Sequence, residues 1–121
     1  MERSERAELR LLVVEDETIV AMELEDILGD LGHAVLGSAA TCEQAMSLIE
    51  KFAGKIDGVV LDANLRGRSA APVMKDLKAR DIPYILASGY GSEELSKQGF
   101  DGPQISKPYH SGEVEKALAA L

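Results

Sequence analysis

Short apolar segments alternate along the chain with stretches in which apolar residues recur at helical spacing. The apolar segments are Leu11–Val14, Ala34–Gly37, Gly58–Leu61, Tyr84–Ala87 and Pro103–Ser106. The third segment is apolar throughout, which is typical of a strand covered on both faces of a sheet. Because a helical pattern follows each segment, the chain predicts a parallel sheet whose strands are joined by right-handed crossovers.

The helical patterns differ in strength. The clearest follows the first strand, where the spaced apolar residues are Val20, Leu24, Ile27, Leu28 and Leu31. Thr41, followed three residues later by Gln44, predicts a capping box at the start of the second helix. Residues 91–100 contain two glycines and little periodicity, so we expect a short helix and a mobile loop there. The last helix is expected to run to the end of the chain.

These elements predict an α/β protein of the (βα)5 doubly wound, flavodoxin-like kind. Its five-stranded parallel sheet would have the order 2-1-3-4-5. No linker or shift in composition divides the chain, so we expect residues 1–121 to form a single domain. Residues 1–9 would form a flexible N-terminal extension.

Composition and charge narrow the range of functions. The net charge of −8 disfavours direct binding to nucleic acids, which requires a basic face, and to anionic membranes. No apolar run approaches the ~20 residues of a membrane span, and the charged N-terminus does not resemble a signal peptide. Cys42 is the single cysteine, so no internal disulfide can form, and a cytoplasmic location fits.

Polar side chains gather where the predicted strands end. The groups after the first, third, fourth and fifth strands are Glu15-Asp16-Glu17, Asp62, Ser88-Gly89 and Lys107-Pro108. In an open parallel sheet, ligands bind outside the carboxyl ends of the strands, at the point where strand order reverses. In the order 2-1-3-4-5 this point lies between the first and third strands, which brings Glu15, Asp16 and Asp62 to one crevice.

This meeting of carboxylates predicts phosphoryl chemistry. Three carboxylates packed together repel one another and would take up protons unless a cation binds. Their oxygen atoms suit Mg²⁺, which could hold an incoming phosphate that bare carboxylates would reject. Asp62 could then be the nucleophile and form an acyl phosphate. Lys107 would supply a positive charge, and Ser88 a hydrogen bond, to the phosphoryl oxygens.

Four motifs in order resemble the receiver domains of two-component response regulators. These motifs are Val13-Val14-Glu15-Asp16-Glu17, Val60-Leu61-Asp62, Ala87-Ser88-Gly89 and Lys107-Pro108-Tyr109. The resemblance implies that Asp62 is the phosphoacceptor. It implies that Asp16, Asp62 and the backbone carbonyl of Asn64 hold Mg²⁺, for which Mn²⁺ or Ca²⁺ could substitute. Glu15 would act through water.

The same resemblance implies how a signal passes. A histidine kinase or a histidine phosphotransfer protein would donate the phosphoryl group, and the chain would catalyse only its own phosphorylation and dephosphorylation. Ser88 would be the switch hydroxyl and Lys107 its partner, and the bond before Pro108 is often cis in this family. We expect no output domain, so the region after the fourth strand would control a protein partner. Otherwise the chain is a phosphate sink or part of a longer protein.

Some positions depart from the family pattern. Many receivers carry an aromatic switch residue three positions before the lysine, where this chain has Gln104. Residues 83–90 are partly similar to the receiver branch with a Phe-Ala-Thr-Gly-aromatic-Tyr signature, with Ser88 in place of its threonine. We hypothesise that Tyr90, or the loop formed by residues 89–91, carries the signal.

Other functions fit parts of the pattern. A haloacid-dehalogenase-type phosphatase also uses an aspartate after a strand, but it needs a second aspartate where this chain has Asn64. A flavin- or nucleotide-binding domain needs a phosphate loop after the first strand, where residues 15–17 would repel a phosphate. A receiver-like domain that works by binding alone is disfavoured by Asp62, Asp16 and Lys107.

The loop after the third strand carries two basic residues, Arg66 and Arg68, on either side of Gly67. They are either solvated loop charges or aids to docking the phosphodonor.

Overall fold

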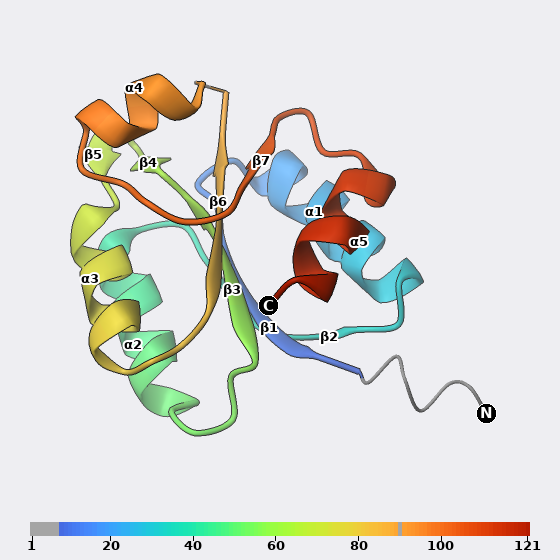
Figure 1. Cartoon of the computed structure of the whole chain (residues 1–121). Coiled ribbons are helices and arrows are strands. Elements are labelled where there is room, and N and C mark those ends of the chain that lie inside the picture. The colour runs from blue at the N-terminus through green and yellow to red at the C-terminus, as the bar shows by residue number, and fades with distance from the viewer. Residues whose placement is uncertain (1–7, 90) are drawn as a thin grey trace.

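The computed structural model describes residues 8–89 and 91–121, except for the side chain of Ser92. In chain order its elements are β1 (Arg10–Val14), α1 (Thr18–Asp30), β2 (Ala34–Ala39), α2 (Cys42–Lys51), β3 (Gly58–Asp62), β4 (Asn64–Leu65), β5 (Arg68–Ser69), α3 (Ala71–Ala79), β6 (Tyr84–Ser88), α4 (Ser92–Lys97), β7 (Gln104–Ser106) and α5 (Ser111–Ala119) (Figure 1). The predicted alternation of strands and helices is confirmed, with strand ends shifted by one or two residues.

Parallel strands make the main sheet, in the order β2-β1-β3-β6-β7. This is the predicted order 2-1-3-4-5, because the labels β4 and β5 belong to a separate two-stranded hairpin that was not expected. The chain places β2 on one side of β1 and β3 on the other. Strand order therefore reverses between β1 and β3, whose carboxyl ends are aligned by the pairing of Val14 with Leu61.

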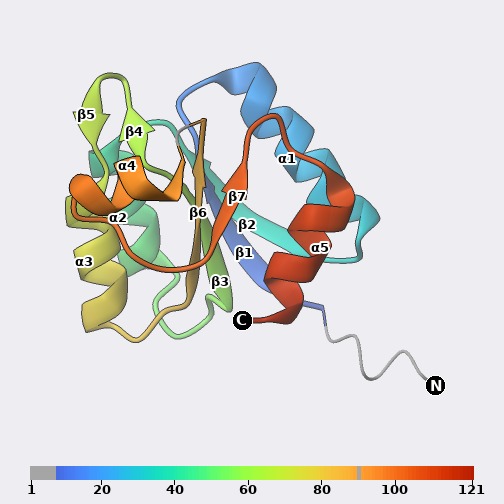
Figure 2. The ribbon, with the colours of Figure 1, turned by 45° about the horizontal axis from the view of Figure 1, so that its top comes forward.

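Helices cover both faces of this sheet. Figures 1 and 2 show α1 and α5 on one face and α2 and α3 on the other, with α4 on the side of α3. Consecutive residues of β3 serve the two faces in turn. Leu61 packs in the apolar cluster with residues of α2 and α3, and Val60 packs in the cluster with residues of α1 and α5. Burial on both faces explains why this strand is apolar up to Asp62.

The helix ends agree with the sequence in part. Thr41 caps α2 as expected, since its hydroxyl accepts the Gln44 N–H at 3.1 Å. The Gln44 side chain accepts the N–H of Ala40 at 2.8 Å, so the capping box is displaced by one residue. The expectation that the last helix reaches the final residue was wrong. α5 ends at Ala119 because its last turn tightens, and Leu121 lies beyond it with 39% of its surface exposed.

The segment before β1 is tied to the domain. Leu9 was expected in a flexible extension, but its N–H donates to His33 Nδ1 at 3.0 Å and its carbonyl accepts the Ala34 N–H at 2.9 Å. These bonds hold the segment against the start of β2. Residues 1–7 of the expected extension lie outside the described residues.

Within the described residues, no helix is both long enough and apolar enough to cross a membrane.

Candidate functional site

Three carboxylates meet at the carboxyl ends of β1 and β3. Glu15 and Asp16 directly follow β1, and Asp62 is the last residue of β3. One oxygen from each of the three lies within 4.8 Å of the others. Glu15 is 2% exposed and Asp62 is 5% exposed, whereas Asp16 is half-buried. The cluster could hold a metal ion, and it lies where the strand order reverses.

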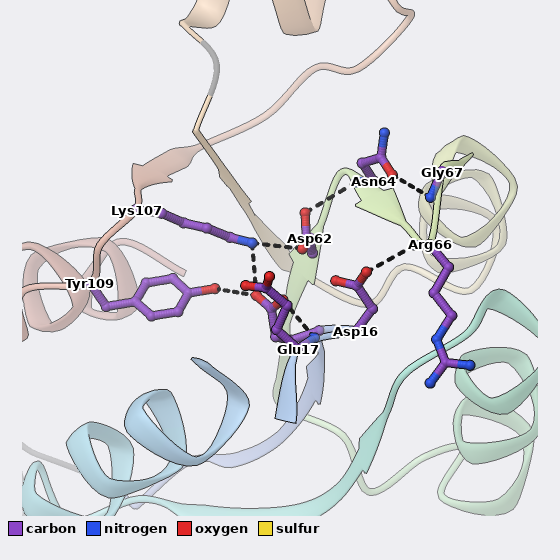
Figure 3. Close-up of polar contacts among 9 residues, drawn as sticks. Asp16, Glu17, Asp62, Asn64, Arg66, Gly67, Lys107 and Tyr109 are labelled. Carbon is purple, nitrogen blue, oxygen red and sulfur yellow. Dashed lines mark hydrogen bonds and ion pairs between the residues drawn. The ribbon is translucent and has the colours of Figure 1, made fainter. Parts of the chain in front are cut away.

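Lys107 approaches this cluster from the end of β7. Its Nζ lies 2.7 Å from Asp62 Oδ2 and 2.8 Å from Glu15 Oε1, so one ammonium group is shared by two buried carboxylates (Figure 3). The peptide bond between Lys107 and Pro108 is cis, as the family resemblance implies. The structure therefore brings Lys107 to the three carboxylates that the sequence placed in one crevice.

Burial governs the electrostatics of the site. Removal from water raises the pKa of Asp62 to about 6, and the neighbouring charge of Glu15 adds to the rise. Hydrogen bonds from Lys107 and from the Asn64 N–H oppose it. Burial also disfavours the charge on Lys107, but the hydrogen bonds to Asp62 and Glu15 and the attraction of their negative charges together outweigh that effect and raise its pKa. Asp62 is thus mostly a carboxylate at pH 7, with its negative charge weakly solvated.

The β4–β5 hairpin supplies backbone donors to the same carboxylates. Asp62 Oδ1 accepts the Asn64 N–H at 3.1 Å, and Asp16 Oδ2 accepts the Arg66 N–H at 3.0 Å. The Asn64 side chain closes the turn by accepting the Gly67 N–H at 2.9 Å. Arg66 and Gly67 both have positive φ, of 54° and 80°, which suits a two-residue hairpin turn. The hairpin therefore fixes the outer edge of the site.

The side chains of the two arginines in this hairpin lie away from the carboxylates that its backbone N–H groups contact. In Figure 3 the Arg66 guanidinium points away from Asp16 and Asp62. Arg68 forms an exposed ion pair with Glu43 of α2, with 3.3 Å between Nη1 and Oε2. The contact of Arg66 with the site is made by its N–H, which the residue type alone did not reveal.

Tyr109 is a residue of the site to which the sequence assigned no role. Its hydroxyl donates to Glu15 Oε1 at 3.1 Å, and the Glu17 N–H donates to the other oxygen of that carboxylate at 3.1 Å. Burial and the charge of Glu15 raise the pKa of the Tyr109 hydroxyl above its usual range. The one available signal was the tyrosine in Lys107-Pro108-Tyr109, and nothing in the sequence connected it with Glu15.

Ser88 and Gln104 lie on β6 and β7, the two strands that follow β3 in the sheet. Ser88 is the buried last residue of β6, and its carbonyl accepts the Lys107 N–H at 3.2 Å. Ser88 therefore lies on the strand next to that of Asp62, and its backbone is hydrogen-bonded to Lys107. Gln104 begins β7, is half-buried and pairs with Leu86. Tyr90, the predicted signalling residue, lies outside the described residues.

The donor set fits a divalent cation. If ionised, the carboxylates Glu15, Asp16 and Asp62 and the one ammonium of Lys107 leave an excess of two negative charges. The carboxylate oxygens are hard ligands of the kind that Mg²⁺ prefers. A divalent cation would balance the excess and offset both the burial of the Asp62 carboxylate and its repulsion by Glu15.

Known proteins resemble the chain over nearly its whole length. The family model for the response regulator receiver domain matches residues 11–119. The phyllosphere-induced regulator PhyR of Methylorubrum extorquens is 30% identical over 113 residues, which cover 90% of this chain and 42% of PhyR. The chain spans about half the length of the curated relatives that it matches most strongly.

Solved structures agree with this result. SdrG from Sphingomonas melonis Fr1, known from a solution structure, is 39% identical in sequence, with a TM-score of 0.80. The match covers 93% of this chain and 95% of the SdrG chain. A BeF3-activated conformation of SdrG from Pseudomonas melonis Fr1 is 40% identical, with a TM-score of 0.78, and covers 94% of this chain and 97% of its own. The chain therefore belongs to the family of response regulator receiver domains, the signalling domains of two-component systems.

Proposed function

We propose that the chain accepts a phosphoryl group from phosphohistidine onto Asp62, with Mg²⁺, and so acts as the phosphoacceptor of a two-component system or phosphorelay. The observation that carries this proposal is the setting of Asp62. Its buried carboxylate ends β3 inside an acidic cluster and contacts Lys107 Nζ at 2.7 Å. Receiver domains are signalling phosphoacceptors rather than enzymes that turn over an external substrate, which supports the same role here.

The transfer is a substitution at phosphorus. An oxygen of Asp62 forms the new bond to phosphorus while the P–N bond of phosphohistidine breaks, and the imidazole nitrogen keeps that electron pair. Lys107 Nζ lies 2.7 Å from Asp62 Oδ2, so its positive charge would stabilise the negative charge of a phosphoryl group attached there. Because Asp62 is almost fully buried, little water has to be displaced before its carboxylate attacks.

Several residues of the acidic cluster and the adjacent hairpin would bind Mg²⁺ together. Mg²⁺ would supply charge neutralisation and a point of attachment for the phosphoryl oxygens. Asp16, Asp62 and the backbone carbonyl of Asn64 would hold it, with Glu15 acting through water, and Mn²⁺ or Ca²⁺ could substitute. The oxygen-only donor set and the excess negative charge support this assignment.

The signal would leave from the region between β6 and α4. Ser88 ends β6 beside Lys107, so a phosphoryl group on Asp62 would draw both residues toward it. With Gln104 at the usual aromatic position, Tyr90 or residues 89–91 would pass the change on. The activated conformation of SdrG supports a two-state domain, because a chain 40% identical to this one adopts such a state with BeF3.

The partners follow from this chemistry. The donor would be a histidine kinase or a histidine phosphotransfer protein in the cytoplasm. The target would be a protein rather than nucleic acid, in keeping with the net charge of −8. Alternatively, the chain would serve as a phosphate sink for its donor.

Incubation with acetyl phosphate and Mg²⁺, followed by intact mass measurement, tests the proposal. Wild type should gain one phosphoryl group, and Asp62→Asn should gain none. Asp101→Asn is the matched control, because Asp101 is an exposed carboxylate that pairs with Lys78 away from the cluster. It should be modified like wild type. A wild type that stays unmodified, or an Asp62→Asn variant that is modified equally, would refute the proposal.

A further inference from the structure

Glu15 is held by three donors that lie in two loops, one after β1 and one after β7. Its Oε1 accepts Lys107 Nζ at 2.8 Å and the Tyr109 hydroxyl at 3.1 Å, and its Oε2 accepts the Glu17 N–H at 3.1 Å. These contacts use both oxygens of a side chain that is almost fully buried. The carboxylate is therefore fixed in orientation within the acidic cluster.

Two of these donors are side chains, and of the two Tyr109 donates to Glu15 alone among the described carboxylates. Lys107 divides its ammonium between Glu15 and Asp62 at nearly equal distances. The Tyr109 ring packs in the apolar cluster with Ile105 and Val114, which aims its hydroxyl at the one carboxylate. The Tyr109 ring therefore contributes to the apolar core, and its hydroxyl contributes a hydrogen bond to the site.

We infer that Tyr109 is a positioning residue for the metal and phosphoryl site, acting through Glu15. This inference rests on the proposed phosphorylation of Asp62. The hydroxyl takes part of the charge of Glu15 and fixes its carboxylate beside Asp16 and Asp62. It also leaves Lys107 available to Asp62.

The consequence of losing the hydroxyl follows from the shared lysine. Without Tyr109 as a donor, Glu15 Oε1 would draw Lys107 closer and away from Asp62. Glu15 would also gain freedom to rotate out of the cluster. Both changes weaken the arrangement of oxygens offered to a divalent cation, as loss of a hydrogen-bonding partner behind a metal site generally does.

The experiment compares Tyr109→Phe with Tyr84→Phe, each a loss of one hydroxyl. Tyr84 is a matched control, because it also hydrogen-bonds to an acidic residue, Asp101, but lies at the opposite end of β6 from the site. Mg²⁺ is titrated into each protein and the dissociation constant is read from backbone amide shifts. Tyr109→Phe should bind Mg²⁺ about tenfold more weakly than wild type. Tyr84→Phe should bind it as wild type does.

A second measurement separates positioning from packing. In the Glu15→Ala background the acceptor is gone, so adding Tyr109→Phe should change Mg²⁺ affinity less than twofold if the hydroxyl acts through Glu15. Phosphorylation by acetyl phosphate should likewise need more Mg²⁺ for half its maximum rate in Tyr109→Phe, with a smaller change in the rate at saturating Mg²⁺.

The outcomes are distinguishable. Equal Mg²⁺ affinity of wild type and Tyr109→Phe would overturn the role of Tyr109. An equal loss in Tyr84→Phe, or an undiminished effect of Tyr109→Phe in the Glu15→Ala background, would overturn it as well. If wild type itself bound no Mg²⁺, the proposed metal site would fail instead.

Discussion

Asp62 combines two demands that oppose each other. As a nucleophile it must be ionised, yet it is almost fully buried beside a second carboxylate, which favours the protonated form. Lys107 and the Asn64 N–H recover only part of the lost solvation, so the pKa stays raised at about 6. In the absence of a cation the folded domain is therefore destabilised by its own phosphoacceptor at neutral pH.

This balance predicts how stability depends on pH in metal-free buffer. Because folding raises the pKa of Asp62 from 3.8 to about 6, its stability contribution is fully present below pH 4 and is lost as pH rises to 6. Asp62→Asn removes that loss. Its unfolding free energy relative to wild type should rise by on the order of 1–3 kcal/mol between pH 4 and 7, measured by urea unfolding with EDTA.

Asp101→Asn provides the control of opposite sign. The hydrogen bond from Lys78 lowers the pKa of Asp101, so this carboxylate stabilises the fold above its unfolded pKa and loses that effect as pH falls. Asp101 is exposed, and the change should be small. If the stability difference between Asp62→Asn and wild type did not vary with pH, the raised pKa of Asp62 would be contradicted.

At the scale of elements, the β4–β5 hairpin is the part of the site that is most sensitive to backbone geometry. Its turn residues carry positive φ, and its N–H groups contact Asp16 and Asp62. A non-glycine residue, Arg66, already occupies one left-handed position at some energetic cost. Gly67 supplies the other at no such cost.

Gly67→Ala should therefore separate local strain from function. It adds a side chain at a φ of 80°, with none of the described atoms within 4 Å of the new Cβ, and should destabilise the fold by about 1 kcal/mol through the backbone alone. Gly54→Ala is the matched control, since Gly54 has a φ of 86° and equally open surroundings after α2. Both variants should lose similar stability in thermal unfolding.

Only Gly67→Ala should also weaken Mg²⁺ binding, because its turn orients the Arg66 N–H that contacts Asp16. Mg²⁺ titration of both variants measures this difference. Equal Mg²⁺ affinities in the two variants would mean that the hairpin does not shape the site.

Strands and helices were predictable where a pattern extends over several residues. Val59–Leu61 had to be a strand buried on both faces, and the structure buries it so. The hairpin was not predicted, because strands of two residues are too short to show a period. Its turn carries Arg66 where the common two-residue turns carry asparagine, aspartate or glycine.

At the scale of the whole molecule, topology assembles the site. The rule for open parallel sheets brought Glu15, Asp16 and Asp62 together, since it needs only strand order and strand ends. It could not bring in Tyr109, which lies 94 positions from Glu15 and beyond the end of β7. The contacts made by the Arg66 N–H and by the Tyr109 hydroxyl depend on the path of the loops that carry them, and residue type does not reveal that path.

If one cation neutralises the cluster, Mg²⁺ must stabilise the whole fold. At a Mg²⁺ concentration one hundred times the dissociation constant, the unfolding free energy of wild type should increase by about 2.7 kcal/mol. Asp16→Asn should lose most of this gain. Asp26→Asn, at an exposed position of α1, should keep it. Urea unfolding with and without Mg²⁺ decides the matter, and a Mg²⁺ effect that was the same in both variants would place the cation elsewhere.

The most direct test of the central claim is to locate the acyl phosphate chemically. Protein treated with acetyl phosphate and Mg²⁺ is reduced with borohydride, which converts a phosphoaspartate to homoserine, and its peptides are analysed by mass spectrometry. We predict homoserine at position 62, and none when EDTA replaces Mg²⁺. Homoserine at another aspartate, or the same yield at position 62 with EDTA, would contradict Mg²⁺-dependent phosphorylation of Asp62.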